Sequence, residues 1–439
     1  MNLGQILMHN RLSFDKRLAL LGGEPVRRKS WPTWPQADLR TKRYVQDVLR
    51  SGRWGIGGKY MGAPLYERRF AEAFARFHGV AHCVPVANGS AALVTALAAI
   101  GVGFGDEVII PGLVWISCAT AVRRVGAIPV LVDVDAQTLC ITPEAVHRAM
   151  TPKTKAVIVV HAYCAVADMD AFAALAVETG IPIIEDCSQA HGSTWKGRRV
   201  GTFGRVGIFS MGNSKLLSCG EGGAAITNDF ELYDKMQQVR GDGYRYKSAA
   251  PCVGHSELEE HGSIQGYNFC LSEFQSAVLF GGLRNLERQN QLRQRNGAVL
   301  RDLCSSISGI TVLHRHPNVD TLAYFRFCTR LDLSVFGGAS IEQIRRAAVA
   351  ELNESTIERV DPPLNNYHLY KPLASVGGFS DSQIIRVDPT GYELPVAEQA
   401  YGECLTFHHA MLLGTESDMF DIARMFEKLK ANRESLAGI

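Results

Sequence analysis

The sequence predicts an α/β protein with a mostly parallel sheet covered by helices on both faces, followed by a smaller α+β unit. Short apolar runs alternate with helical patterns after Pro64, as strands and crossover helices do in parallel sheets. A long helical pattern that starts at Ser272 separates this region from a C-terminal part of different texture. The 439 residues also exceed the size at which one hydrophobic core usually stops growing. We therefore expect two domains.

The elements of the first domain can be taken in order. The first sixty residues are irregular and contain two Trp-Pro pairs and a glycine-rich loop, which predicts a surface arm or lid. Apolar residues at helical spacing follow and predict a helix that ends at Gly79. The alternating pattern then predicts strands over Val84–Val86, Val108–Ile110, Val130–Val134, Ala156–His161 and Ile181–Glu185, and helices over Ala91–Ile100, Ala119–Arg124 and about 169–180.

Two later apolar runs, VGIFSM and GGAAITN, have no helix between them and predict neighbouring strands joined by a functional loop. The helix that starts at Ser272 is long enough to bridge two domains. We therefore predict an N-terminal arm and substrate loop over 1–60, a large domain over 61–305 and a small domain over 306–439.

Charge and composition exclude several classes of protein. The 46 Lys and Arg nearly balance the 44 Asp and Glu, and this net charge of +2 argues against nucleic-acid binding and polybasic membrane anchoring. The sequence has no apolar run long enough for a membrane span and no secretory h-region. The eleven cysteines lack metal-type spacing and are interpreted as buried thiols in a reducing compartment. We expect a cytoplasmic protein without a metal site.

The most informative segment is IPIIEDCSQAHGS, in which a strand ends at Glu185 and Asp186, with Gln189 and His191 just beyond. Open parallel sheets bind ligands outside the carboxyl ends of their strands. Taken alone, Asp186 is as well explained as the cap of the next helix.

Lys215 strengthens the case for a site, because it lies in the loop between the two neighbouring strands and is followed by GEGG. Glycines at this density indicate special backbone angles or a close approach. A lysine held in a crowded, partly desolvated loop has a lowered pKa, and its free amine can attack a carbonyl to form a Schiff base.

Two further features complete the pattern. Asn88, Gly89, Ser90 and Ala91 follow a strand and open a helix, whose N-terminus offers free N–H groups to a phosphate, although Ser90 alone could be a helix cap. Trp115 lies just past another strand and could stack on a ring or belong to the core. A phosphate cradle, a stacking aromatic, a carboxylate and a loop lysine together predict a pyridoxal 5′-phosphate (PLP) site.

At the level of motifs, the sequence resembles the PLP-dependent sugar aminotransferases of the DegT/DnrJ/EryC1/StrS family over about residues 30–430. The motifs that carry the resemblance are EDCSQAHGS, FS-x-x-x-x-K-x-x-x-x-GEGG and GYNFCLSEFQSA. WPTWPQ, DVDAQTLCITP, VFGG and FHHAMLLG are most similar to the branch whose members aminate 2-deoxy-scyllo-inosose or scyllo-inosose with L-glutamine. The resemblance implies the type I fold of PLP-dependent transferases.

The resemblance also implies a role for each residue of the PLP site. Lys215 would bind PLP covalently and move protons, and Asp186 would keep the pyridinium nitrogen protonated. The remaining cofactor contacts would come from Gln189 at the phenolic oxygen, Trp115 on the ring, and Gly89, Ser90, the Ala91 amide and Ser210 around the phosphate. Asn268 would reach the phosphate of a neighbouring subunit, which implies a homodimer with shared active sites.

Substrate contacts are predicted at Trp54 and Lys59 in the glycine-rich loop, at His161 and Tyr163 after a strand, and at His191 and His408. Packing is the alternative explanation for each histidine. Two positions depart from the family pattern: Gly212 stands where relatives usually have His or Gln, and Cys164 where close relatives often have glycine.

The expected reaction is a ping-pong transamination, in which L-glutamine or glutamate donates an amino group and a keto-cyclitol accepts it. A nucleotide-sugar aminotransferase and an enzyme like the 3-amino-5-hydroxybenzoate synthases are the alternatives within catalysis. A non-catalytic PLP-binding regulator is the alternative outside it, although no DNA-binding extension is present. The sequence leaves open which ketone is aminated, and at which step.

Overall fold

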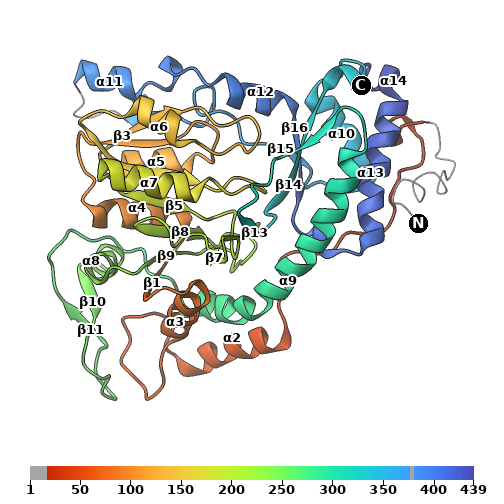
Figure 1. Ribbon diagram of the computed structural model, residues 1–439. Coiled ribbons are helices and arrows are strands. Elements are labelled where there is room, and N and C mark those ends of the chain that lie inside the picture. Colours follow the sequence, from red (N-terminus) through yellow and green to blue (C-terminus); the bar gives the residue numbers. More distant parts are fainter. Residues whose placement is uncertain (1–16, 376–379) are drawn as a thin grey trace.

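A computed structural model describes residues 17–375 and 380–439. Its centre is a seven-stranded sheet in the order β1-β9-β8-β5-β4-β2-β3 (Figure 1). The strands are β1 His82–Val86, β2 Glu107–Pro111, β3 Ile128–Val132, β4 Thr154–Val160, β5 Ile183–Asp186, β8 Val206–Ser210 and β9 Gly223–Thr227. Pairing is parallel from β8 to β3 and antiparallel where β9 meets β8 and β1. The prediction of an α/β fold on a mostly parallel sheet is confirmed.

The two antiparallel pairings place three strand ends at one edge of the sheet. Gly223, the first residue of β9, pairs with both Ser210 and Val86, the last residues of β8 and β1. Two reversals of direction make β1 parallel to β8, so the carboxyl end of β1 joins those of the parallel strands. The predicted phosphate cradle and the predicted lysine loop therefore share one edge with Asp186.

Helices follow the strands at nearly the predicted positions. They are α3 Tyr66–His78, α4 Gly89–Ile100, α5 Ser117–Arg124, α6 Pro143–Ala149, α7 Met169–Thr179 and α8 Phe230–Arg240. Gly79 and Gly180 end α3 and α7 in the left-handed conformation, as glycine permits without strain. β3 ends two residues earlier than predicted, because Asp133 leaves the sheet and accepts hydrogen bonds from the N–H groups of Val396 and Ala397.

The helix α9 covers Glu273–Ser305 and starts at a capping box formed by Ser272 and Gln275. Beyond it lies a four-stranded antiparallel sheet in the order β12-β14-β16-β15. Its strands are β12 Ile310–Val312, β14 Arg326–Leu331, β15 Glu358–Arg359 and β16 Cys404–His408, and its helices are α10 Ile341–Leu352, α13 Glu416–Ala431 and α14 Arg433–Leu436. Figure 1 shows α9 running from beneath the central sheet to this second sheet.

Part of the C-terminal region returns to the central sheet. The segment includes α11 Asp381–Val387 and α12 Pro395–Glu403, which lie above that sheet in Figure 1. An ion pair of 2.9 Å joins Arg386 to Glu107, and the Leu364 N–H donates to the Gly112 carbonyl. A division of the chain into domains at residue 305 stays a prediction. Leu364, Arg386 and Val396, which follow that boundary, contact the large domain.

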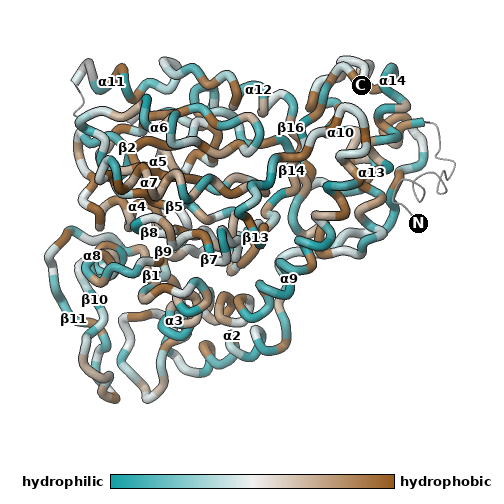
Figure 2. Tube along the Cα trace, in the orientation of Figure 1, coloured by the Kyte–Doolittle hydropathy of each residue, from teal (hydrophilic) through white to brown (hydrophobic). Residues whose placement is uncertain are grey.

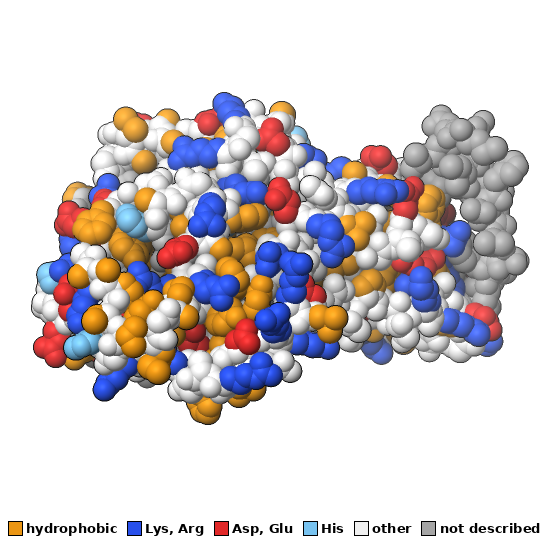
Figure 3. All heavy atoms as spheres, turned by 90° about the horizontal axis from the view of Figure 1, so that it is seen from below, with side chains coloured by type: hydrophobic (Ala, Val, Ile, Leu, Met, Phe, Trp, Pro, Cys, Tyr) orange, Lys and Arg blue, Asp and Glu red, His pale blue; other side chains and the backbone are white. Residues whose placement is uncertain are grey.

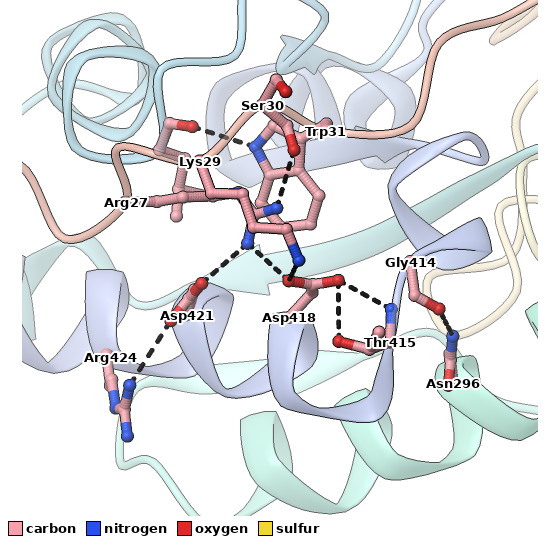
Figure 4. Close-up of polar contacts among 11 residues, drawn as sticks. Arg27, Lys29, Ser30, Trp31, Asn296, Gly414, Thr415, Asp418, Asp421 and Arg424 are labelled. Carbon is pink, nitrogen blue, oxygen red and sulfur yellow. Dashed lines mark hydrogen bonds and ion pairs between the residues drawn. The ribbon is translucent and has the colours of Figure 1, made fainter.

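The N-terminal arm is also divided between the two parts. Residues 1–16 of the predicted arm lie outside the described residues. Arg27 binds Asp418 and Asp421 on α13 and stacks on Trp31 (Figure 4), whereas α2 Leu39–Ser51 packs on α9 and α3.

Shorter strands complete the described chain. They are β6 Thr194–Trp195 and β7 Arg198–Arg199 with β13 Val319–Thr321, and β10 Tyr244–Tyr246 with β11 Leu258–Glu260. Figure 2 shows hydrophobic residues along the central strands and hydrophilic ones along much of α9. Between residues 17–375 and 380–439, no helix has the length and apolar composition that crossing a bilayer requires.

Candidate active site

Lys215 lies in the loop between β8 and β9. Hydrogen bonds to the backbone of Lys215 and of its neighbour hold this loop in place. Its N–H donates to the Gly212 carbonyl at 2.9 Å, and its own carbonyl accepts a hydrogen bond from the Trp34 indole at 3.1 Å. His409 contacts the preceding carbonyl, that of Ser214, at 3.0 Å, and its ring meets that of Trp34 edge to face. Trp34 and His409 therefore support the loop from the arm and from the end of β16.

The Lys215 amine has no hydrogen-bond or ion-pair partner among the described residues. Its Nζ lies 4.2 Å from the centroid of the Phe325 ring. Burial lowers the pKa of this amine, Asp186 and Asp361 raise it, and Arg326 lowers it further, with a net lowering. A lysine with a lowered pKa and no fixed partner can act as a nucleophile and as a proton carrier.

Asp186 ends β5 and is buried. Oδ1 accepts a hydrogen bond from the Ser188 N–H at 2.9 Å, and Oδ2 accepts one from the Cys118 thiol at 3.4 Å. A thiol is a weak donor, so Oδ2 can still receive a proton-bearing nitrogen. Burial raises the pKa of Cys118 well above its usual value, and Asp186 adds to that effect, so the thiol stays protonated.

Gln189 and Tyr163 are brought together behind the lysine. The Gln189 Oε1 accepts a hydrogen bond from the Tyr163 N–H at 2.6 Å. Tyr163 has a φ of 53°, and its hydroxyl donates to Asp361 Oδ2 at 3.0 Å while accepting from the Asp361 N–H at 2.8 Å. Burial raises the pKa of Asp361, whereas Tyr163, Lys215 and Arg326 lower it, with a net raising.

The first turn of α4 meets Ser210 at very short range. A Cβ added at Gly89 would lie 2.6 Å from the Ser210 Cβ, so only glycine allows this approach. Ser90 is exposed, whereas the Ala91 N–H donates to the Asn88 side chain at 2.8 Å. The cap of α4 is therefore Asn88, and the Gly89 and Ser90 N–H groups lie in the turn where no helical acceptor exists.

Trp115 lies between β2 and α5 with 52% of its surface exposed. Its carbonyl accepts a hydrogen bond from the N–H of Cys118, the residue that contacts Asp186. An exposed indole beside a buried carboxylate is suited to stacking on a planar ring.

The three histidines predicted as substrate contacts are buried. His161 is fully buried, with Nε2 3.4 Å from Glu185, whose oxygens also accept hydrogen bonds from the backbone of residues 201, 203 and 204. Burial lowers the pKa of His191 to about 3, with Lys215 adding to the effect. Burial, followed by Arg326, lowers the pKa of His408 to about 4. His191 and His408 are therefore neutral near pH 7.

Glu185, His161 and Cys187 also form a cluster of metal-type ligands within 4.8 Å of one another. The Glu185 oxygens are engaged by backbone N–H groups, so this cluster is accounted for by holding the chain between residues 201 and 204.

The remaining predicted residues lie apart from Lys215. Trp54 packs against Phe274, and the backbone of Lys59 pairs with that of Ser256. Asn268 is exposed, and its backbone pairs with Gly241. No contact among the described residues joins Trp54, Lys59 or Asn268 to Lys215.

Sequence reasoning missed Asp361, Arg326 and Phe325, and used Trp34 only for the resemblance. These residues come from the small sheet, its connections and the arm, far in sequence from the EDCSQAHGS and GEGG motifs. The only available signal was the HH pair at 408 and 409, of which His409 proves to be the support of the lysine loop.

The chain is similar to known aminotransferases. The model of the DegT/DnrJ/EryC1/StrS aminotransferase family matches residues 35–426. The chain is 48% identical over 421 residues to the L-glutamine:2-deoxy-scyllo-inosose aminotransferase of Micromonospora echinospora, covering 96% of this chain and 99% of that one. It is 43% identical to the L-glutamine:scyllo-inosose aminotransferase of Streptomyces griseus, covering 95% and 98%.

Among solved structures, the fold is similar to the crystal structure of 3-amino-5-hydroxybenzoic acid synthase. The TM-score is 0.77 and the identity 31%, covering 92% of this chain and 99% of the other.

Proposed function

The chain belongs to the DegT/DnrJ/EryC1/StrS aminotransferase family, and we propose that it moves the amino group of L-glutamine to a keto-cyclitol with PLP as its cofactor. The observation that carries the proposal is the Lys215 amine, which has no hydrogen-bond or ion-pair partner in the described part of the chain and lies at the edge where Asp186, Ser210 and the first turn of α4 meet. The relatives in this branch use 2-deoxy-scyllo-inosose or scyllo-inosose by name, and we propose one of these as the acceptor.

The residues present fit PLP. The close approach of Gly89 to Ser210 brings the first turn of α4 beside the Ser210 hydroxyl, where the N–H groups of Gly89 and Ser90 would hold a phosphate. The Ala91 amide, predicted as a phosphate donor, is already bonded to Asn88, so we assign this role to Gly89, Ser90 and Ser210 instead. Trp115 would stack on the ring, Gln189 would face its phenolic oxygen, and Asp186 would hold the protonated ring nitrogen.

PLP, when bound, would supply a carbonyl and an electron-withdrawing ring. Lys215 would take a proton from the carbon that bears the donor's amino group and deliver it to C4′ of the cofactor. Its lowered pKa keeps enough of the amine neutral to accept that proton. Asp186 is itself buried, so water screens its charge less than that of a surface carboxylate.

We further propose a homodimer in which Asn268, Trp54 and Lys59 of one subunit complete the site of the other. All three lie on exposed segments without a contact to their own Lys215 among the described residues. Exposed apolar side chains lie nearby, including Met61 and Leu49. Figure 3 views this side of the molecule and shows apolar side chains among charged ones. A cytoplasmic location stays a prediction.

Absorbance of the PLP-loaded enzyme tests the reaction in its two halves. L-Glutamine should bleach the long-wavelength band, and 2-deoxy-scyllo-inosose or scyllo-inosose should restore it, with glutamate and a nucleotide-linked keto-sugar as comparators. Bleaching that only the nucleotide-linked ketone reverses would instead support a nucleotide-sugar aminotransferase. Absence of any bleaching by an amino donor would contradict the proposal and favour a non-catalytic PLP-binding protein.

A further inference from the structure

A cavity of about 570 Å³, apart from Lys215, lies beside the small sheet. Its walls come from β12, β14, the last part of α9 and the loop after β3. We infer that this cavity binds a small multivalent anion of the phosphate type. The three side chains that would bind it are Arg301, Arg315 and Arg330.

All three arginines line the same cavity, and Arg301 and Arg315 have no carboxylate partner among the described residues. Arg301 donates to the Leu313 carbonyl at 2.9 Å and also contacts the hydroxyl of Tyr324, a neutral group. Arg315 donates to the carbonyls of Val319 and Asp320, also backbone atoms. Neutral carbonyls satisfy some N–H groups but cancel no charge, so both guanidinium groups keep their full positive charge.

Arg330 has the one carboxylate contact of the three. Its Nε lies 3.7 Å from Glu403, which is an ion pair without a hydrogen bond. The Nε and Nη2 atoms of Arg330, and Nη2 of Arg301, are buried without a hydrogen-bond partner in the described chain. Even with Glu403 counted, the cavity wall carries an excess of two positive charges. A bound anion would remove this repulsion and engage the unmatched donors after small side-chain rotations.

The geometry of the wall favours a phosphate-type ligand over a single monovalent ion. Guanidinium groups present paired donors that match the oxygens of phosphate, and three of them suit an anion with several charged oxygens. The cavity volume lies in the range of small-molecule sites. Thr311, which pairs with Arg330 across β12 and β14, and Gln137 and His314 add polar groups to the wall.

The cavity spans the contact between the large and small sheets. The His314 N–H donates to the Gln137 carbonyl at 2.8 Å, which links the loop after β3 to the residue after β12. The cavity shares no lining residue with the Lys215 site, so its occupation is independent of the proposed amino-group transfer.

Isothermal titration of the PLP-loaded enzyme with pyrophosphate and with inorganic phosphate tests the inference. Loading with PLP fills the cofactor's own phosphate site, so remaining binding reports another site. We expect pyrophosphate to bind more tightly than phosphate. Arg301→Gln and Arg315→Gln should each weaken pyrophosphate binding by about tenfold or more, as expected when a charge-assisted hydrogen bond is lost.

Two further variants serve as an independent test and as a control. Thr311→Glu places a carboxylate opposite Arg330 at an exposed position, where folding is not at risk, and should also abolish binding. Arg345→Gln, in α10 and paired with Glu342, is the matched control and should leave the affinity unchanged. The inference would be overturned if pyrophosphate released no more heat than potassium chloride at the same ionic strength. It would also be overturned if all variants bound pyrophosphate with equal affinity.

Discussion

Lys215 owes its reactivity to opposing effects on one amine. Burial and Arg326 lower its pKa, whereas Asp186 and Asp361 raise it. Burial dominates, so more of the amine is neutral near pH 7 than in an exposed lysine. Asp361 is a positioning residue in this balance, because it also holds the Tyr163 hydroxyl, and Tyr163 in turn donates its N–H to Gln189.

Replacing Lys215 by alanine should abolish amino-group transfer. A positioned general base typically contributes about 10²–10⁴-fold to a rate, and Lys215→Ala also removes the covalent anchor of PLP. The variant should still bind PLP through Ser210, Asp186 and Trp115, which ultrafiltration and absorbance can measure. Lys196→Ala, an exposed lysine paired with Asp170, is the control. Full activity in Lys215→Ala would show that the assignment is wrong.

Replacing Asp361 by asparagine should shift the titration of Lys215 to lower pH. The Asp361 charge raises the pKa of Lys215, so its removal lowers that pKa further and exposes the neutral amine at a lower pH. Acylation of Lys215 in the cofactor-free enzyme, followed by mass spectrometry across a pH series, measures the midpoint. Asp320→Asn, an exposed carboxylate, should leave it in place. A shift to higher pH would contradict this account.

At the scale of elements, the site depends on where strands end. The carboxyl ends of β1, β5 and β8 share one edge because β9 runs antiparallel to both of its neighbours. Gly89 opens α4 against the last residue of β8, and this contact would set the width of the proposed phosphate cradle.

Replacing Gly89 by alanine should weaken PLP binding by about tenfold, or about 1.4 kcal/mol, because the added methyl group would overlap Ser210 and separate α4 from β8. PLP affinity of the cofactor-free enzyme, measured by fluorescence quenching, reports the change. Gly402→Ala is the matched control, since nothing lies within 4 Å of a Cβ at this position in α12. Equal PLP affinity in the two variants would argue against the cradle.

At the scale of the whole molecule, buried ion pairs tie the arm to α13 and α13 to α10. Arg27 is 2% exposed and contacts Asp418 at 2.7 Å and Asp421 at 2.8 Å (Figure 4). Lys428 and Glu351, also buried, form a second pair of 2.8 Å near the same arm. Each pair would leave an uncompensated buried charge if one partner were removed.

Replacing Arg27 by alanine should destabilise the protein by about 3–5 kcal/mol, the usual cost of breaking a buried ion pair. Thermal unfolding at a fixed scan rate should show a clearly lower midpoint. Arg28→Ala supplies the control, because Arg28 and Glu24 are 69% and 67% exposed and such pairs contribute little. Equal midpoints for the two variants would mean that the arm contact contributes little stability.

Mixing two inactive variants tests the shared active site. If Asn268 acts on the neighbouring subunit, Lys215→Ala and Asn268→Ala subunits should regain partial activity after joint refolding, because each mixed dimer then holds one intact site. Light scattering would establish that dimers form. If Asn268 acts within its own chain, no activity returns.

The sequence by itself determined the alternation of strands and helices, the cap at Gly79, and the motifs that contain Lys215 and Asp186. These features depend on residues close in sequence, whose periodicity and turn chemistry act locally. Only the tertiary structure decided which side chains surround the lysine. The lysine loop is surrounded by residues from distant segments, namely Asp361, Phe325, Trp34 and His409. Local sequence patterns cannot predict such contacts. The tertiary structure also gave Glu185 and Asp186, adjacent in β5, different partners. Glu185 accepts a hydrogen bond from the Gly204 N–H and Asp186 one from the Cys118 thiol, because neighbouring strand residues point to opposite faces of the sheet.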